Sequence, residues 1–327
     1  MKLRASVLAF VTAFLPLQNA WAAEPGWPQS IAIATASPGG TYYVYGQALA
    51  DILGRELGIE VTAQATQGST RNVILVETGH AALGLITMGI GWEAWNGTGE
   101  WTKGQRFQAM RAILPMYDSP LQIAVAKRLG MRSLDRLAGK RIGVGPKAGT
   151  GGVYFPQIFK ALGIAAVLRN GAWEDLLQQM SSGELDGIAV AVGVPVTELA
   201  ALDAMEPVNY LQPTPDQVAI IRNHIPEVTP SLIPAGTYPS LTKDYHTLGL
   251  YNFAVVDKDL PNDLVYKIVK AVFEHRQELE SFHPAAKETL PANVDRNTFL
   301  PFHPGAVRYY REIGVDIPAA LAARGDK

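Results

Sequence analysis

The chain has 327 residues, enough for two domains with separate hydrophobic cores. Its formal net charge is −2, so it lacks the strongly basic surface that is typical of nucleic-acid-binding proteins. Hydrophobic residues make up 48% of the chain and charged residues 18%, which indicates a folded globular protein. The chain contains no cysteine, which excludes disulfides, thiolate metal sites and thiol catalysis.

The first 22 residues have the pattern of a secretory signal peptide. Lys2 and Arg4 precede an uncharged apolar run at 5–17, and an Ala-Trp-Ala motif follows at 20–22. The run is too short to span a bilayer comfortably, and no cysteine follows it that could carry a lipid. We therefore expect cleavage after Ala22 and an exported, soluble mature protein. A buried N-terminal helix is the alternative.

From residue 31 the first half of the chain alternates predicted strands and helices. Strands are predicted at 31–34, 60–65 and 83–86 from short apolar or alternating runs. Helices are predicted from 44 to 57 and from 73 to 78, and a glycine follows each of them. This alternation indicates a parallel α/β sheet, in which ligands bind outside the C-terminal ends of the strands.

The turns at these strand ends carry candidate anion-binding residues. The first turn reads SPGGTYY at 37–43, the second reads QGST at 67–70, and the third strand ends at Thr87-Met88. Glycine lets the backbone approach a ligand closely, and the N-terminus of the following helix offers free N–H groups to an anion. The alternative is an ordinary loop in which Thr41 only caps its helix.

The same pattern recurs after residue 121. A strand is predicted at 121–126 and another at 141–144, and the turn GPKAGTGG at 145–152 leads into a helix that ends at Leu162. The Gly-Thr pair of this turn, 149–150, occupies the position that 40–41 holds in the first half. These repeats indicate two lobes of similar topology that face each other.

The last third begins with a proline-rich stretch at 213–234, followed by a strand at 248–256 and a helix at 261–282. We expect the chain to cross between the lobes twice, near Tyr117–Leu121 and near Leu211–Pro215. The predicted organisation is therefore a signal peptide, a discontinuous first lobe and a central second lobe. Their ranges are 1–22 for the signal peptide, 23–118 and 214–327 for lobe I, and 119–213 for lobe II.

A set of motifs in a characteristic order connects the chain with a known family. The motifs are GGTYY, QATQGSTRN, GPKAGTGG, SSGELDGIAV, IPAGTYP and HPGAVRYYRE. In these the chain resembles the TAXI-type solute receptors of TRAP transporters over nearly all of its mature length. The resemblance implies an α/β fold of the type II periplasmic-binding-protein kind, with two similar lobes, a two-crossing hinge and a ligand cleft between them. It also implies a periplasmic receptor that captures a glutamate-like or other carboxylate and delivers it to an ion-gradient-driven permease.

The resemblance also implies a set of ligand-binding positions when it is transferred motif by motif. Tyr238 would close over the ligand, Tyr117 and Ser119 lie at the first crossing as further candidates, and Thr87 with Met88 lies at the third strand end. The remaining implied positions are Gly40, Thr41, Tyr42, Gly68, Ser69, Thr150, Gly151, Gly152 and Gly193.

Two basic residues depart from the family pattern within these turns. Arg71 and Lys147 stand where neutral or acidic residues are expected. Each is either a solvated surface residue or a contact for an anionic ligand, and the sequence leaves both possibilities open.

Catalysis has little support in the sequence. There is no G-x-S-x-G elbow, no Gly-Lys-Ser/Thr of a Walker A loop, and no H-x-x-x-H or H-E-x-x-H spacing for a metal. We therefore expect no enzyme activity, no cofactor and no metal, and a monomer that binds no nucleic acid. The alternatives are a ligand-sensing subunit that signals to a membrane partner and, more remotely, an enzyme that acts on a small anion.

Overall fold

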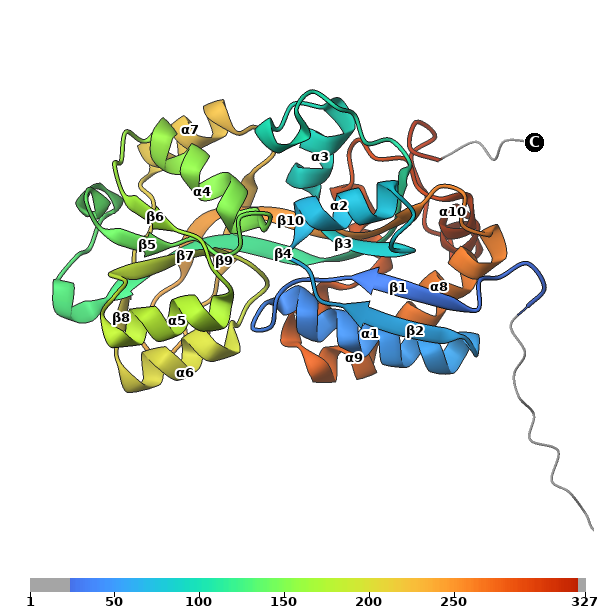
Figure 1. Cartoon of the computed structure of the whole chain (residues 1–327), viewed down its shortest axis with the longest axis horizontal. Helices are drawn as coiled ribbons and strands as arrows, with labels where there is room; N and C mark the ends of the chain where they lie inside the picture. The colour runs from blue at the N-terminus through green and yellow to red at the C-terminus, as the bar shows by residue number, and fades with distance from the viewer. Residues whose placement is uncertain (1–23, 323–327) are drawn as a thin grey trace, which may run out of the picture.

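A computed structural model describes residues 24–322, so the predicted signal peptide and its cleavage site lie outside the described residues. Strands and helices alternate along most of the chain and form two lobes that lie side by side (Figure 1). Within residues 24–322, no helix has both the length and the apolar character needed to cross a membrane.

In chain order the strands and α-helices are β1 (Ser30–Ala34), α1 (Thr41–Leu57), β2 (Glu60–Gln64), α2 (Ser69–Glu77), β3 (Leu83–Thr87), α3 (Met88–Asn96), β4 (Met110–Ala126), β5 (Arg141–Gly143), α4 (Thr150–Ala161), β6 (Val167–Arg169), α5 (Trp173–Ser182), β7 (Gly187–Ala191), α6 (Thr197–Met205), β8 (Val208–Tyr210), α7 (Pro215–His224), β9 (Thr229–Ile233), β10 (Tyr245–Asp257), α8 (Asn262–Glu274), α9 (Arg276–Phe282) and α10 (Pro304–Glu312). Short 3-10 helices are η1 (Glu100–Thr102), η2 (Lys127–Leu129), η3 (Leu134–Leu137), η4 (Pro284–Glu288) and η5 (Pro291–Arg296).

The two lobes have the same strand order. In the first lobe the order is β2-β1-β3-β10-β4, in which β1 is parallel to β2 and β3 while β10 is antiparallel to both its neighbours. In the second lobe the order is β6-β5-β7-β4-β8, in which β5 is parallel to β6 and β7 while β4 is antiparallel to β7 and β8. Each lobe thus uses a long strand that arrives from the other lobe. This topology confirms the predicted fold of two similar α/β lobes.

The long strands β4 and β10 form the connection between the lobes. They run antiparallel along the middle of the molecule (Figure 1), and Asp118–Pro120 of β4 pairs with Gly249–Tyr251 of β10. The first crossing therefore lies within the predicted segment 117–121, whereas the second lies in β10 and not near 211–215. Because two paired strands resist shear but allow bending and twisting, this pair is the hinge of the fold.

The proline-rich segment before β10 packs against the second lobe. The side chain of Gln217 on α7 donates a hydrogen bond to Asp135 at 3.0 Å, and α7 lies against α4. Tyr238 and Tyr245 share a buried core with Trp173 of α5. We therefore propose that the second lobe extends as far as β10, in place of the predicted boundary at residue 213.

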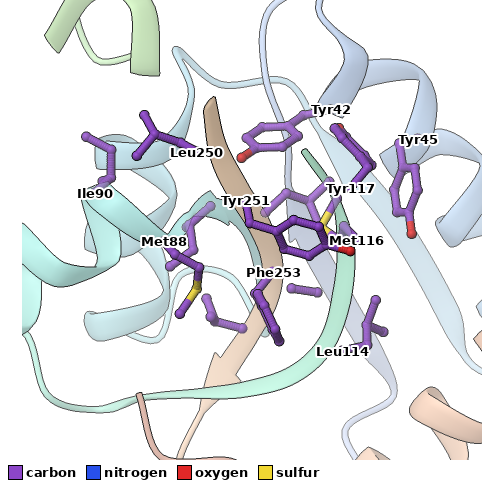
Figure 2. Close-up of a cluster of buried hydrophobic side chains, with 14 of the residues drawn as sticks. Tyr42, Tyr45, Met88, Ile90, Leu114, Met116, Tyr117, Leu250, Tyr251 and Phe253 are labelled. Carbon is purple, nitrogen blue, oxygen red and sulfur yellow. The ribbon is translucent and has the colours of Figure 1, made fainter. Parts of the chain in front are cut away.

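Aromatic side chains fill the core where the first lobe meets the hinge (Figure 2). Tyr45 of α1 is fully buried, and its ring meets the edge of the Tyr117 ring with centroids 5.3 Å apart. Tyr42 lies on the same face of α1, with its ring centroid 6.3 Å from that of Tyr117. The three-residue spacing of the tyrosines places both rings on the buried side of the helix. This packing fixes the position of β4 beneath the start of α1.

Candidate ligand-binding site

A pocket lies between the lobes at the C-terminal ends of the parallel strands. A volume of about 40 Å³ is open to the centres of water-sized atoms, so the lining side chains leave room for a small ligand. The turns after β1, β2 and β5, the segment after β7, the first residue of α5 and the hinge strand β4 all contribute to its wall. The lining residues are Ala36, Ser37, Gly40, Thr41, Tyr42, Gln67, Gly68, Ser69, Tyr117, Ser119, Pro146, Gly149, Thr150, Gly151, Trp173, Ala191, Val192 and Gly193.

The N-termini of α1, α2, α4 and α5 converge on this pocket. The N-cap residues of α1, α2 and α4 are Gly40, Gly68 and Gly149, and none of these helices has a side-chain cap or an acidic residue in its first turn. The first N–H groups of a helix have no partner within the helix, and they lie at the positive end of its dipole. The Thr70 amide of α2 donates to the Ala148 carbonyl at 3.1 Å, and the other N–H groups at the positive ends of these three helices remain available to an anion.

Among residues 24–322, no charged side chain lines the pocket. Arg71 and Lys147, which the sequence left open as contacts for an anion, are both exposed and lie outside the lining. Their positions favour the solvated interpretation of both residues. Any negative charge in the pocket therefore meets backbone N–H groups and hydroxyls.

Hydrogen bonds join the two lobes across the pocket. Thr41 Oγ1 donates to the carbonyl oxygen of Gly193 at 3.0 Å. Ser69 Oγ lies 3.3 Å from Thr150 Oγ1, and Thr87 Oγ1 lies 3.2 Å from the same atom. Each of these hydrogen bonds joins a hydroxyl group of the first lobe to a residue of the second lobe. The lobes are therefore closed on each other.

The glycines at the lobe interface allow this close approach. A Cβ atom at Gly68 would lie 2.8 Å from the Cα of Gly149, which is closer than side chains pack in proteins. Thr70 Oγ1 also donates to the carbonyl oxygen of Ala148 at 3.0 Å beside this contact. The turn after β2 therefore lies directly against the turn before α4.

Asn252 of β10 organises the floor of the pocket. It is fully buried, and its Nδ2 donates to the carbonyl oxygen of Tyr117 at 2.6 Å and to Ser119 Oγ at 2.8 Å. Its Oδ1 accepts a hydrogen bond from the hydroxyl of Tyr42 at 2.5 Å. Burial raises the pKa of the Tyr42 phenol, so this group stays a neutral donor. Sequence reasoning missed Asn252, although a polar residue within the apolar run LYNFAVV was a usable signal.

Two buried hydroxyls of the pocket lack a hydrogen-bond partner among residues 24–322. They belong to Tyr117 and Ser37, and both residues line the pocket. Tyr117 is fully buried, and burial raises the pKa of its phenol well above the usual value, so the hydroxyl stays protonated. A buried hydroxyl without a partner is costly, which makes both groups candidates for contact with a ligand.

Most of the predicted site residues line the pocket, but some do not. Thr87 lies one hydrogen bond away, because its hydroxyl contacts Thr150. Met88 lines a different cavity, beside Trp92 and Tyr251. Gly152 does not line the pocket and packs against its own turn, since a Cβ there would lie 2.2 Å from the carbonyl oxygen of Pro146.

Tyr238 does not fit its predicted role as a cover over the ligand. Its ring stacks on that of Tyr210 with centroids 5.2 Å apart, and its hydroxyl accepts a hydrogen bond from the Val196 amide at 3.1 Å. It is buried in the core of the second lobe and is absent from the pocket lining. The segment that carries Tyr238 packs on the second lobe rather than crossing over the cleft, and this explains the difference.

Trp173, which the sequence reasoning did not select, supplies an aromatic wall. It is the first residue of α5, is 7% exposed, and lies against Gly39, Gly40 and Gly145 of two neighbouring turns. A tryptophan directly before Glu174 and Asp175 gives no clear local signal of a binding site, because it fits a core position equally well.

Within the described residues, no group of three or more histidine, aspartate or glutamate side chains is placed to hold a metal ion. The remaining features form one consistent arrangement: two lobes of equal topology, a hinge of two strands, and a pocket where helix N-termini meet. This is the fold of the periplasmic solute-binding proteins.

Comparisons with known proteins agree with this architecture. A solved structure of a periplasmic transporter matches with a TM-score of 0.55 and 14% identity, over 82% of this chain and 88% of that chain. MatC from Rhodopseudomonas palustris with bound malate matches with a TM-score of 0.58 and 12% identity, over 82% of this chain and 92% of that chain. At such identities the similarity establishes the fold. The family model of the NMT1-like family matches residues 33–314, and the chain belongs to this family.

Proposed function

We propose that the protein is an exported receptor that captures a small organic anion between its lobes and delivers it to a membrane transporter. The observation that carries this proposal is the convergence of uncapped helix N-termini on an interlobe pocket without charged side chains. The malate bound to MatC is a carboxylate ligand of a protein with the same fold, which supports the same ligand class here.

In this proposal the carboxylate contacts backbone N–H groups of the first turns of α1, α2 and α4. The ligand-binding residues are then Gly40, Thr41, Gly68, Ser69, Thr150 and Gly151, with Tyr42, Tyr117 and Gly193 around them. Neutral donors bind an anion without a full opposing charge, so the ligand also dissociates when the lobes open. No histidine, aspartate, glutamate or lysine in the described part of the chain lines the pocket as a general base, which favours binding over catalysis.

The ordered motifs of the sequence favour a more specific identity within this class. They resemble the TAXI-type receptors, so the proposed partner is a TRAP permease driven by an ion gradient. The genes next to the coding sequence provide a direct test, because a TRAP system requires membrane subunits encoded nearby. A neighbouring sensor kinase in place of a permease would instead favour the sensing role.

Export to the periplasm is part of the same proposal. The predicted cleavage after Ala22 leaves a mature chain that begins at Ala23. N-terminal sequencing of protein released by osmotic shock tests this directly. Recovery of a chain that still begins at Met1 would contradict it.

The ligand class is best tested by native mass spectrometry of the purified protein, followed by calorimetric titration with carboxylates. We expect an added mass that disappears on denaturation and that corresponds to an organic acid. Binding of neutral sugars or of cations, with no response to any carboxylate, would overturn the proposal.

A further inference from the structure

The charges around the pocket restrict the ligand beyond the general class of organic anions. Asp118 lies next to two lining residues, but its carboxylate accepts a hydrogen bond from Ser231 of β9 and does not line the pocket. Glu174 of α5 and Glu198 of α6 are exposed and also lie outside the lining. The ammonium group of an amino acid would therefore enter this pocket without a carboxylate partner, which is strongly unfavourable.

Polar and apolar parts of the lining alternate around the pocket. Ala36 and Trp173 lie beside Gly40, the N-cap of α1, and Pro146 lies beside Gly149, the N-cap of α4. Neither an arginine nor a lysine of residues 24–322 lines the wall, so the carboxylate of a ligand depends on backbone N–H groups and hydroxyls.

The pocket does offer two neutral polar contacts to a ligand. Tyr117 and Ser37 line the pocket, and their buried hydroxyls have no partner among the described residues. An oxygen atom next to the carboxylate, as in a 2-oxo or 2-hydroxy acid, would provide a partner for such a hydroxyl. An unsubstituted fatty acid would leave both hydroxyls without a partner, at a cost in affinity.

We propose that the pocket selects 2-oxo or 2-hydroxy carboxylates and rejects amino acids. This inference rests on the proposed function and narrows it. It also departs from the glutamate-like ligand that the sequence resemblance implies. In this proposal the hydroxyl of Tyr117 forms a hydrogen bond with the oxygen atom at the second carbon of the ligand.

Calorimetric titration of the mature chain with matched pairs tests the selection. L-lactate and L-alanine share a three-carbon skeleton. At the second carbon lactate carries a hydroxyl group and alanine carries an ammonium group, whereas propionate carries neither. We expect lactate or pyruvate to bind most tightly. L-alanine and L-glutamate should bind at least roughly 100-fold more weakly because their ammonium group has no carboxylate partner, and propionate roughly 10-fold more weakly because it leaves a buried hydroxyl without a partner.

A variant of Tyr117 tests the assigned contact. Tyr117→Phe removes only the hydroxyl, so it should weaken lactate binding roughly 10-fold and leave propionate binding within about twofold. Tyr45→Phe is the matched control, because the Tyr45 hydroxyl contacts Thr289 at 2.9 Å and does not line the pocket. It should leave the ratio of lactate to propionate affinity unchanged.

The outcomes separate this inference from the proposed function. Tight binding of L-alanine or glutamate would overturn the inference and leave a carboxylate receptor in place. Equal losses for lactate and propionate in Tyr117→Phe would overturn the role of Tyr117. Binding of no carboxylate at all, or of sulfate alone, would overturn both proposals.

Discussion

The hydroxyl of Thr41 donates a hydrogen bond to the carbonyl oxygen of Gly193 across the two lobes, at 3.0 Å. Thr41 begins α1 in the first lobe, and Gly193 follows β7 in the second. The sequence suggested that this hydroxyl binds the ligand or caps its helix. In the structure it holds the lobes together, and α1 has no side-chain cap. The affinity of the receptor for any ligand therefore depends on contacts that the ligand itself does not make.

Thr41→Val should weaken ligand binding by destabilising the closed state. The substitution keeps the β-branched shape and leaves the Gly193 carbonyl without its donor only when the lobes are closed. The expected cost is about 1–3 kcal/mol, or roughly 5- to 150-fold in affinity. Calorimetric titration with the co-purified ligand measures it. Thr197→Val, at the exposed start of α6, is the control and should bind as the parent does. An unchanged affinity for Thr41→Val would mean that the bond contributes nothing to closure.

Gly68→Ala should hold the lobes apart. Its Cβ would lie 2.8 Å from the Cα of Gly149 in the closed state, and its φ of +110° is strained for any residue with a side chain. Small-angle scattering with saturating ligand should show a larger radius of gyration for this variant than for the parent, together with weaker binding.

Gly79→Ala separates the steric effect from backbone strain. Gly79 also has a positive φ, +69°, but a Cβ there would meet no atom within 4 Å. This variant should lose some stability and still close normally. If both variants close like the parent, the contact between Gly68 and Gly149 does not limit the approach of the lobes.

Asn252→Ala should be one of the most destabilising single substitutions at the hinge. It removes both donors and the acceptor that join Tyr42, Tyr117 and Ser119. Leaving these buried groups unpaired should lower the free energy of unfolding by more than about 2 kcal/mol. Urea denaturation provides the measurement. Asn96→Ala, which removes a single bond to the Trp92 carbonyl, is the control. A loss no larger than that of the control would show that water replaces the missing amide.

Stability should fall in mild acid because of His303. Burial lowers the pKa of this imidazole to about 4, and its Nδ1 accepts a hydrogen bond from the Gly305 amide at the start of α10. In the unfolded chain the pKa is about 6.5, so between pH ~6.5 and ~4 the unfolded state binds a proton that the folded state does not. The contribution of His303 to stability is therefore complete above pH ~6.5 and decreases by up to ~3 kcal/mol as the pH falls to ~4.

His303→Asn isolates this effect from the other ionisable groups. Asparagine is a good N-cap residue and does not titrate. Urea denaturation of both proteins from pH 7 to pH 4 should show the parent losing stability relative to the variant. Parallel pH profiles would mean that His303 is accessible to protons in the folded state.

Local patterns in the sequence predicted much of the fold. The strands at 31–34, 60–65 and 83–86 correspond to β1, β2 and β3, and the glycine-containing turns lie at their ends as expected. The patterns failed between 213 and 245, where the proline-rich stretch gave no predicted helix or strand although the structure has α7 and β9. The missed signal was a capping box, in which Thr214 and Gln217 exchange hydrogen bonds around a proline at the first position of α7.

The sequence by itself determined the repeated α/β pattern and the polar turns at the strand ends, because both depend on residues that are close together in the chain. Only the tertiary structure decided which groups meet in the pocket. Asn252 and Tyr117 are 135 residues apart, and the pairing of β4 with β10 brings them into contact. The partner of Thr41 likewise depends on the angle at which the hinge sets the two lobes. Side-chain periodicity carries no information about that angle, so the roles of these hydroxyls follow only from the folded molecule.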